Sequence, residues 1–157
     1  TGLMVVAKHG YAHDQLRRQL HGGGFSRRYV AVCLGAPNPP AGTIDLPIAR
    51  AEGSAIQRKI DSSGQEARTD YRLLRTRGPL ALLLVTPQTG RTHQIRLHMA
   101  AVGHPLAGDW LYGTEDKVLI ARPALHSVQL SFSHPVTGAC LSFTAPLPGD
   151  MKLLLEL

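Results

Sequence analysis

The sequence has few cysteines and no long apolar run. Cys33 and Cys140 are the two cysteines among 157 residues, and each lies in an apolar, strand-like stretch. Such cysteines are typical of buried free thiols rather than of a disulfide framework. No apolar stretch approaches the roughly 20 residues that a membrane-spanning helix needs, and residues 3–7 are too short a run for the core of a signal peptide. We therefore expect a cytoplasmic protein without a membrane partner.

Motifs of several common enzyme classes are also absent. The sequence contains no G-x-S-x-G nucleophile turn, no Walker loop and no G-x-G-x-x-G. Eight histidines raise the question of a metal site. However, His9 and His13 lack the glutamate of a metalloprotease helix, and His93 and His98 are spaced to point to different sides of a helix. We therefore predict no metal site.

Acidic residues are outnumbered by basic ones. Lys and Arg total 17 against 11 Asp and Glu, which gives a formal charge of +6. This balance favours an anionic partner such as nucleic acid, although a basic protein without such a partner has the same balance. Candidates for contacts with phosphate groups are residues 50–68 and Arg17, Arg18, Arg27 and Arg28.

The order of the expected elements indicates one α+β domain. Residues 11–20 carry apolar side chains four apart, as a helix on a core does, and the glycines at 22–24 end it. In residues 127–133, alternation places Val128, Leu130 and Phe132 on one face of a half-buried strand. A mixed, mostly antiparallel sheet with a few helices is therefore predicted. Its other strands are expected at residues 3–8, 27–35, 66–77, 80–88 and 140–147.

Two segments have the composition of connections between these elements. Residues 36–48 include four prolines and are predicted to form a long surface loop. Residues 51–65 are polar and basic, and we expect them to be exposed or mobile.

The stretch "QTGRTHQIRLHMAAVGHPLAGD", residues 88–109, concentrates hydrogen-bond donors around one expected helix. Thr92 is the predicted N-cap, and the free N–H groups of such a helix end, beside Arg91, favour an anion. Within the helix, Ile95, Met99 and Val102 have the spacing of residues that face a core.

Arg96 borders this apolar stripe. An arginine there is unfavourable to bury unless a carboxylate or a phosphate pairs with it; the alternative is an ordinary solvated basic face. Asp109, in the turn that follows the helix, is predicted to bind backbone N–H groups and stabilise that turn.

Segments along nearly the whole chain resemble the RluA-type family of pseudouridine synthases. The matching segments are "TGLMVVAK", "RRYVAVCLG", "GQEARTDYRLL", "LLLVTPQTGRTHQIRLHMAAVGHPLAGDWLYG" and "LHSVQLSFSHPVTGACLSFTAPLP". The resemblance implies an isomerase that converts uridine in structured RNA to pseudouridine without a cofactor. It also implies a pseudouridine synthase-like catalytic domain with a mostly antiparallel sheet and an RNA-binding cleft. The RNA is expected to be ribosomal RNA, with tRNA as the next choice, and the protein to be a monomer.

The same resemblance assigns roles to individual residues. Tyr29 matches the family tyrosine that stacks on the target base, and Ile95 would pack against the uracil ring. Arg96 matches the arginine that forms a salt bridge with the catalytic aspartate. The remaining substrate-binding candidates come from the same motif: Arg91, His93 and Gln94.

One family motif is missing. The family's catalytic aspartate lies in "H-R-L-D", shortly before the segment matched by residues 1–3, and no aspartate here stands in that motif. We therefore expect residues 1–157 to be the C-terminal portion of a single catalytic domain, incomplete at its N-terminus, and inactive alone. The alternatives are a non-catalytic RNA-binding module and an unrelated metal-dependent hydrolase that uses the histidines.

Overall fold

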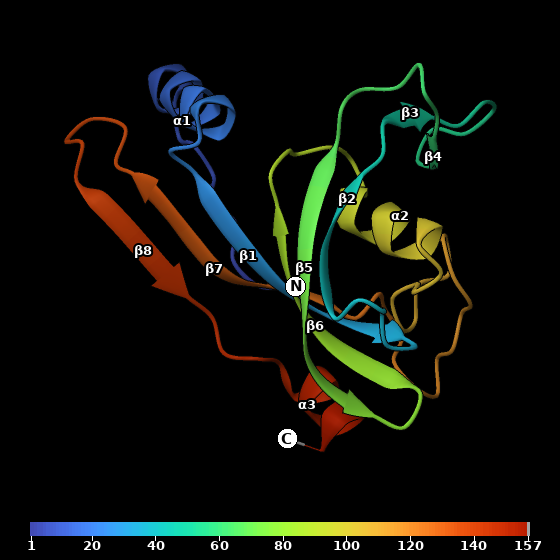
Figure 1. Ribbon diagram of the computed structural model, residues 1–157. Helices are drawn as coiled ribbons and strands as arrows, with labels where there is room; N and C mark the ends of the chain where they lie inside the picture. The colour runs from blue at the N-terminus through green and yellow to red at the C-terminus, as the bar shows by residue number, and fades with distance from the viewer. Residues whose placement is uncertain (157) are drawn as a thin grey trace.

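A six-stranded antiparallel sheet forms the centre of the molecule (Figure 1), which a computed structural model describes over residues 1–156. Its strand order is β2-β5-β6-β1-β7-β8, and a separate pair, β3-β4, lies beside it. The α+β prediction with a mostly antiparallel sheet and a few helices is confirmed. The strands are β1 (Ser26–Leu34), β2 (Ala41–Asp45), β3 (Ile48–Arg50), β4 (Arg58–Ile60), β5 (Arg68–Arg77), β6 (Leu80–Pro87), β7 (Leu125–Ser133) and β8 (Cys140–Thr144), and the helices are α1 (Gly10–Gly22), α2 (Gln94–Ala101) and α3 (Gly149–Leu155).

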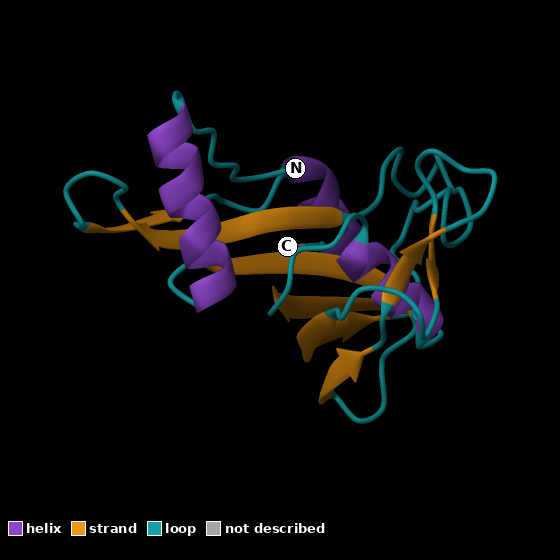
Figure 2. Cartoon of the chain, turned by 90° about the horizontal axis from the view of Figure 1, so that it is seen from above, coloured by secondary structure: helices purple, strands orange, loops and turns teal. Residues whose placement is uncertain are grey.

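The two central strands, β1 and β6, are buried on both faces of the sheet. On one face Val32 and Leu82 pack in a cluster with Met151 of α3. On the other face Leu83 packs in a cluster with Met99 of α2. Side chains of successive strand residues point to opposite faces, so both strands need continuous apolar runs, as their sequences have. Figure 2 shows α1 at one end of the sheet and α2 at the other, beside β3 and β4.

A bulge interrupts the alternation that the sequence predicts in β7. The ladder between β1 and β7 shifts register between Arg28 and Tyr29, which leaves Val128 as the extra residue of β7. Val128 packs against the cluster under α3, whereas Leu130 lies opposite Arg27 on the face that carries Tyr29. The prediction that Val128 and Leu130 share a face is therefore wrong, because a bulge inverts the alternation beyond it.

In three further segments, the secondary structure differs from the one that the sequence predicts. Residues 3–8 form no strand; the bond from Leu3 N to the carbonyl oxygen of Ser127 is their tie to the sheet, and Met4 is 83% exposed. Residues 36–48, predicted as a loop, contain β2, which fits between Pro40 and Pro47 because proline cannot donate to a ladder. Residues 51–65, predicted as exposed or mobile, include β4.

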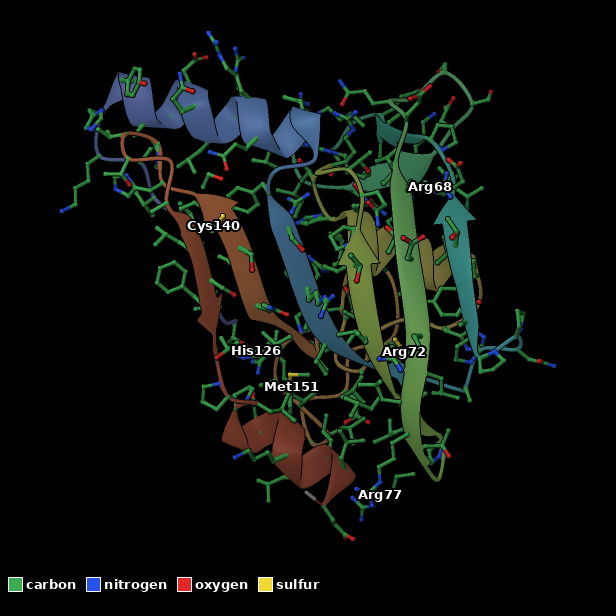
Figure 3. All side chains as sticks on the ribbon, turned by 60° about the vertical axis from the view of Figure 1, so that its left-hand side comes forward. Arg68, Arg72, Arg77, His126, Cys140 and Met151 are labelled. Atoms are coloured by element: carbon green, nitrogen blue, oxygen red, sulfur yellow. The ribbon has the colours of Figure 1, made fainter. Side chains whose placement is uncertain are left out.

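Of three residues that the sequence predicts to be buried, Cys33 is buried as expected, but Cys140 and Val102 are exposed. Cys33 is buried and free, and burial raises the pKa of its thiol to about 12. Cys140, in contrast, is exposed on the edge strand β8 (Figure 3). Val102 is 39% exposed because α2 ends one residue before it.

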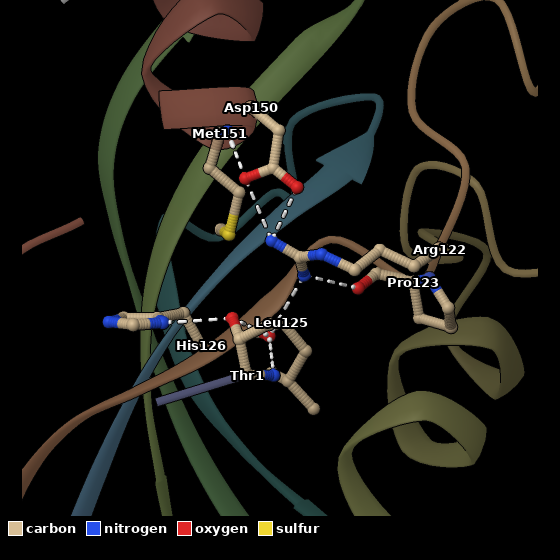
Figure 4. A network of polar contacts seen from close by, with 7 residues as sticks. All are labelled: Thr1, Arg122, Pro123, Leu125, His126, Asp150 and Met151. Carbon is tan, nitrogen blue, oxygen red and sulfur yellow. Dashed lines mark hydrogen bonds and ion pairs between the residues drawn. The ribbon is translucent and has the colours of Figure 1, made fainter. Parts of the chain in front are cut away.

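An ion pair joins α3 to the segment before β7 (Figure 4). The Arg122 guanidinium lies 2.7 Å from a carboxylate oxygen of Asp150 and also donates to the carbonyl oxygen of Pro123. The Asp150 carboxylate accepts from the backbone N–H of Met151 at 2.8 Å. Both partners thereby fix the start of α3 over the sheet.

Within residues 1–156, no helix has both the length and the apolar character needed to cross a bilayer.

Met151 is fully buried under the central strands, so Met151→Ala should lower the free energy of unfolding by about 2–5 kcal/mol. Urea unfolding followed by circular dichroism measures this change. Leu153→Ala is the matched control on the same helix, since Leu153 is 78% exposed; its effect should stay within about 0.5 kcal/mol. Equal effects of the two changes would contradict this packing.

Candidate active site

The loop that leads from β6 into α2 has a strained backbone. His93 directly precedes the first residue of α2 and has φ 57° and ψ 17°, the left-handed region. Side chains other than glycine rarely adopt this conformation, and such strain is concentrated at functional sites. The prediction of Thr92 as N-cap is wrong: His93 occupies the cap position, and its side chain makes no capping hydrogen bond.

Gln94 holds this loop from inside the protein. Its side-chain oxygen accepts from the backbone N–H of Arg91 at 3.0 Å and from the Thr89 hydroxyl at 2.7 Å. Its side-chain nitrogen donates to the carbonyl oxygen of Arg68 and to the Thr69 hydroxyl, both at 2.9 Å. Gln94 is only 4% exposed, so its hydrogen-bonding groups order the loop. A direct contact of Gln94 with substrate stays a prediction.

The same network continues to a buried histidine. His98 Nε2 lies 2.9 Å from the carbonyl oxygen of Leu46, and Nδ1 lies 2.9 Å from the Thr69 hydroxyl. A carbonyl oxygen can only accept, so we assign the proton to Nε2, and the Thr69 hydroxyl then donates to Nδ1. Burial lowers the pKa of His98, against the raising effect of the bond to Leu46. The ring is therefore neutral at pH 7, and every polar atom of this chain of bonds has a partner.

Arg96 finds its carboxylate partner in Asp109. Its Nε lies 2.7 Å from Oδ2 of Asp109 and its Nη2 lies 2.6 Å from Oδ1, a two-point contact. The Arg96 side chain is 14% exposed and that of Asp109 is fully buried. The sequence-based expectation that Arg96 needs a carboxylate or a phosphate is met, but the partner is 13 residues along the chain.

Asp109 also stabilises the turn after α2, as the sequence predicts. Its Oδ1 accepts from the backbone N–H groups of Leu111 and Tyr112 at 3.1 and 3.2 Å. Burial would raise the pKa of the Asp109 carboxyl. The hydrogen bonds and charge of Arg96, with the two backbone donors, outweigh burial and hold that pKa below its ordinary value. Asp109 is thus ionised at neutral pH, and one carboxylate joins the helix to the turn.

Tyr112 contacts three parts of the site, and its place three residues after Asp109 is the only signal in the sequence that points to it. Its ring lies against the Arg96 guanidinium, with 5.2 Å from the Arg96 Cζ to the ring centroid. Its hydroxyl oxygen accepts from the backbone N–H of Arg58 at 2.9 Å and lies 3.1 Å from Nδ1 of His93. Tyr112 therefore connects β4, the strained residue and the buried ion pair.

A cavity of about 240 Å³ lies next to this ion pair; we call it the uridine-sized cavity. It brings together all six residues that the sequence singles out: Tyr29, Arg91, His93, Gln94, Ile95 and Arg96. The bulge of β7 lies opposite the step from Arg28 to Tyr29 in β1, and Tyr29 lines the cavity; bulges are often found next to functional sites. The cavity thus combines an aromatic ring, an apolar side chain and positive charge, a set suited to a base and its anionic surroundings.

Arg27 is a further residue of this cavity. It was expected only as one of several phosphate contacts. Its Nη2 donates to the carbonyl oxygen of Thr89 at 2.9 Å, but its buried Nε has no hydrogen-bond partner among residues 1–156. Arg27 and Tyr29 also line a second cavity between α1 and residues 3–7, so both side chains are shared by two cavities.

His93 lies in the wall of the uridine-sized cavity as a neutral group. Burial lowers the pKa of His93, and the charges of Arg96 and Arg58 lower it further, against the opposing charge of Asp109.

Among residues 1–156, no three His, Cys, Asp or Glu side chains are grouped as metal ligands.

Comparison with known proteins identifies the family. The sequence model of RNA pseudouridylate synthase matches residues 1–101. The chain is 44% identical over 156 residues to the RNA pseudouridine synthase YjbO of Bacillus subtilis, covering 99% of this chain and 55% of that protein. It is 42% identical over 164 residues to ribosomal large subunit pseudouridine synthase D of Nitrosomonas europaea, covering 99% and 47%. The chain therefore spans about half the length of the curated relatives it matches.

The fold is also similar to solved structures. Human RNA pseudouridylate synthase domain containing 1 superposes with a TM-score of 0.76 at 27% identity, covering 95% of this chain and 65% of that one. Human RNA pseudouridylate synthase domain containing 4 superposes with a TM-score of 0.72 at 22% identity, covering 91% and 66%, which supports the fold alone. By sequence and by fold, the chain belongs to the RNA pseudouridylate synthase family, in its RluA-type branch.

Proposed function

We propose that the uridine-sized cavity receives a uridine of structured RNA and that this chain takes part in its isomerisation to pseudouridine. The observation that carries the proposal is that Arg96, which is paired with the buried Asp109, lines the same cavity as Tyr29 and Ile95. Ribosomal RNA is the proposed substrate, which the name of the Nitrosomonas europaea relative supports. The reaction keeps every atom and electron of the nucleotide, so it requires no oxidant, reductant or cofactor.

In this proposal the uridine leaves the RNA stack and enters the cavity. Extruding a base costs a few kcal/mol, which stacking and backbone contacts offset. Tyr29 stacks on the base and Ile95 packs against the uracil ring. An aspartate then attacks the nucleoside, the bond between C1′ and N1 breaks, and the base turns. C5 of the uracil bonds to C1′ and the aspartate leaves; C5 loses its proton and N1 gains one, so that carbon replaces nitrogen at the sugar.

Arg96 is proposed to align that aspartate. Asp109 engages Nε and Nη2 of Arg96, while Nη1 makes no hydrogen bond within the described part of the chain. A guanidinium has five donors, so Nη1 can serve a second carboxylate and keep it ionised. We propose that the second carboxylate is the aspartate of an H-R-L-D motif, which does not occur among the 157 residues.

Arg96→Lys should reduce turnover at least about tenfold in the protein that contains this chain, because an ammonium cannot hold two carboxylates in fixed planes. The rate of pseudouridine formation in a ribosomal RNA substrate measures this. Arg75→Lys, an exposed arginine on β5, is the control and should leave the rate unchanged. Near-normal turnover of Arg96→Lys would count against the alignment role.

Asp109→Asn keeps the size of the side chain but leaves the Arg96 charge without its carboxylate, so stability should fall by about 3 kcal/mol. The folded-state pKa of Asp109 is lowered. Its stabilising effect is therefore complete above about pH 4 and is lost as pH falls through the lower folded pKa. Urea unfolding between pH 7 and pH 3 should show a smaller loss of stability for Asp109→Asn than for the unmodified protein. Parallel pH profiles would argue against the pair.

The 157-residue chain alone should convert no uridine, since the proposed nucleophile is not part of its sequence. Incubation with ribosomal RNA followed by mass spectrometry of nucleosides tests this. Pseudouridine formed by the chain alone would refute the assignment of the nucleophile to an H-R-L-D motif, although it would leave the family membership intact.

A further inference from the structure

We infer that another cavity, next to the uridine-sized cavity and distinct from the one between α1 and residues 3–7, binds backbone phosphates of the RNA strand that carries the target uridine. This inference rests on the proposed function, because it takes RNA as the ligand. The cavity has a volume of about 610 Å³ and lies between the β3–β4 hairpin and the loop before α2. We call it the arginine cavity, after three of its lining residues: Arg50, Arg58 and Arg91.

Two of these arginines repel one another within the hairpin. Arg50 and Arg58 are directly opposite partners in the antiparallel ladder of β3 and β4. Side chains in such positions lie on the same face with Cβ atoms about 4.5–5.5 Å apart, and like charges there destabilise the pair of strands. An anion between the two guanidinium groups would turn this repulsion into attraction.

The three arginines also lack a carboxylate partner. Within residues 1–156, no carboxylate oxygen lies within 4.0 Å of Arg50, Arg58 or Arg91. Each side chain instead donates to a backbone carbonyl oxygen, as Arg91 does to Glu66 at 2.9 Å. These bonds orient the guanidinium groups but leave their charge uncompensated. In the same hairpin, Lys59 does not line the cavity and is neutralised by Asp61 at 2.8 Å. The two uncompensated cations of β3 and β4 are therefore the two that line the cavity.

The arginine cavity adjoins the uridine-sized cavity. Gly90 and Arg91 line both of them, so a strand that places one base beside Tyr29 has a short path to the hairpin. Thr92 also lines the arginine cavity, and its hydroxyl group is of the kind that contacts phosphate oxygens. The chemistry of the arginine cavity therefore fits phosphate rather than base.

The hairpin has a fixed position relative to Arg96. The backbone N–H of Arg58 donates to the Tyr112 hydroxyl, and the ring of Tyr112 lies against the Arg96 guanidinium. A phosphate held by Arg50 and Arg58 would thus set the distance at which the neighbouring base meets Arg96. Phosphate contacts position a nucleic acid without reading its sequence, and that is the role inferred here.

Salt dependence of RNA binding tests this inference. The probe is a fluorescein-labelled, uridine-containing single-stranded RNA of 12 nucleotides, and the protein is the one that contains this chain. Each phosphate neutralised adds about 0.7 to the slope of log affinity against log salt for single strands. Arg50→Gln/Arg58→Gln removes the pair that holds one phosphate, so it should lower the slope by about 0.7 and weaken binding at least about fivefold at 100 mM KCl. Because the change removes a repulsive pair, the hairpin should remain folded, as circular dichroism and the thermal midpoint would verify.

The matched control is Arg72→Gln/Arg75→Gln, which removes the same charge from exposed positions of β5. Figure 3 places Arg72 along β5 between Arg68, at the end near the hairpin, and Arg77, near α3. The control should keep the slope of the unmodified protein. An unchanged slope in Arg50→Gln/Arg58→Gln, or an equal loss in both double variants, would overturn the arginine cavity as a phosphate site while RNA binding itself stands. Absence of RNA binding by the unmodified protein would instead overturn the proposed function.

Discussion

The side chain of Arg96 is mostly buried, and the organisation of the site depends on which group balances its charge. A buried charge without a partner is strongly destabilising, whereas a two-point contact with a carboxylate fixes both groups in one plane. Asp109 supplies that contact and also accepts from two backbone N–H groups of the following turn. The same carboxylate therefore determines where the helix, the turn and Tyr112 lie relative to one another. The ion pair between Arg96 and Asp109 therefore fixes the position of Arg96 in the cavity wall.

The loop in front of α2 depends on neutral hydrogen bonds instead. The left-handed conformation of His93 is unfavourable by itself, and the amide of Gln94 compensates by binding the loop on one side and β5 on the other. Its continuation through Thr69 to His98 has a partner for every polar atom, which lets the chain bury three polar side chains under the site. Rigidity at this place keeps Arg91 and Ile95 in the cavity wall.

Much of the fold follows from patterns that are local in sequence. The apolar runs of β1 and β6 and the four-residue spacing in α1 are enough to predict those elements. The prolines of residues 36–48 favoured the prediction of a loop. Strand β2 could not be predicted there, because it forms by pairing with β5, which is distant in sequence. The six predicted site residues line one cavity, since five of them come from one motif. Asp109 as the partner of Arg96, and Tyr112 as the link to β4, could not be predicted, because both depend on how the turn folds back onto α2.

The single extra residue in β7 allows one strand to serve two layers of the molecule. Without the extra residue, Val128 and Leu130 would point to the same side of the sheet, so Leu130 could not lie beside Tyr29 while Val128 packs under α3. With the bulge, Val128 fills the layer under α3 and Leu130 reaches the opposite layer. One face of the sheet is therefore packed under α3, while the other face presents the apolar side chain of Leu130 to the cavity beside Tyr29.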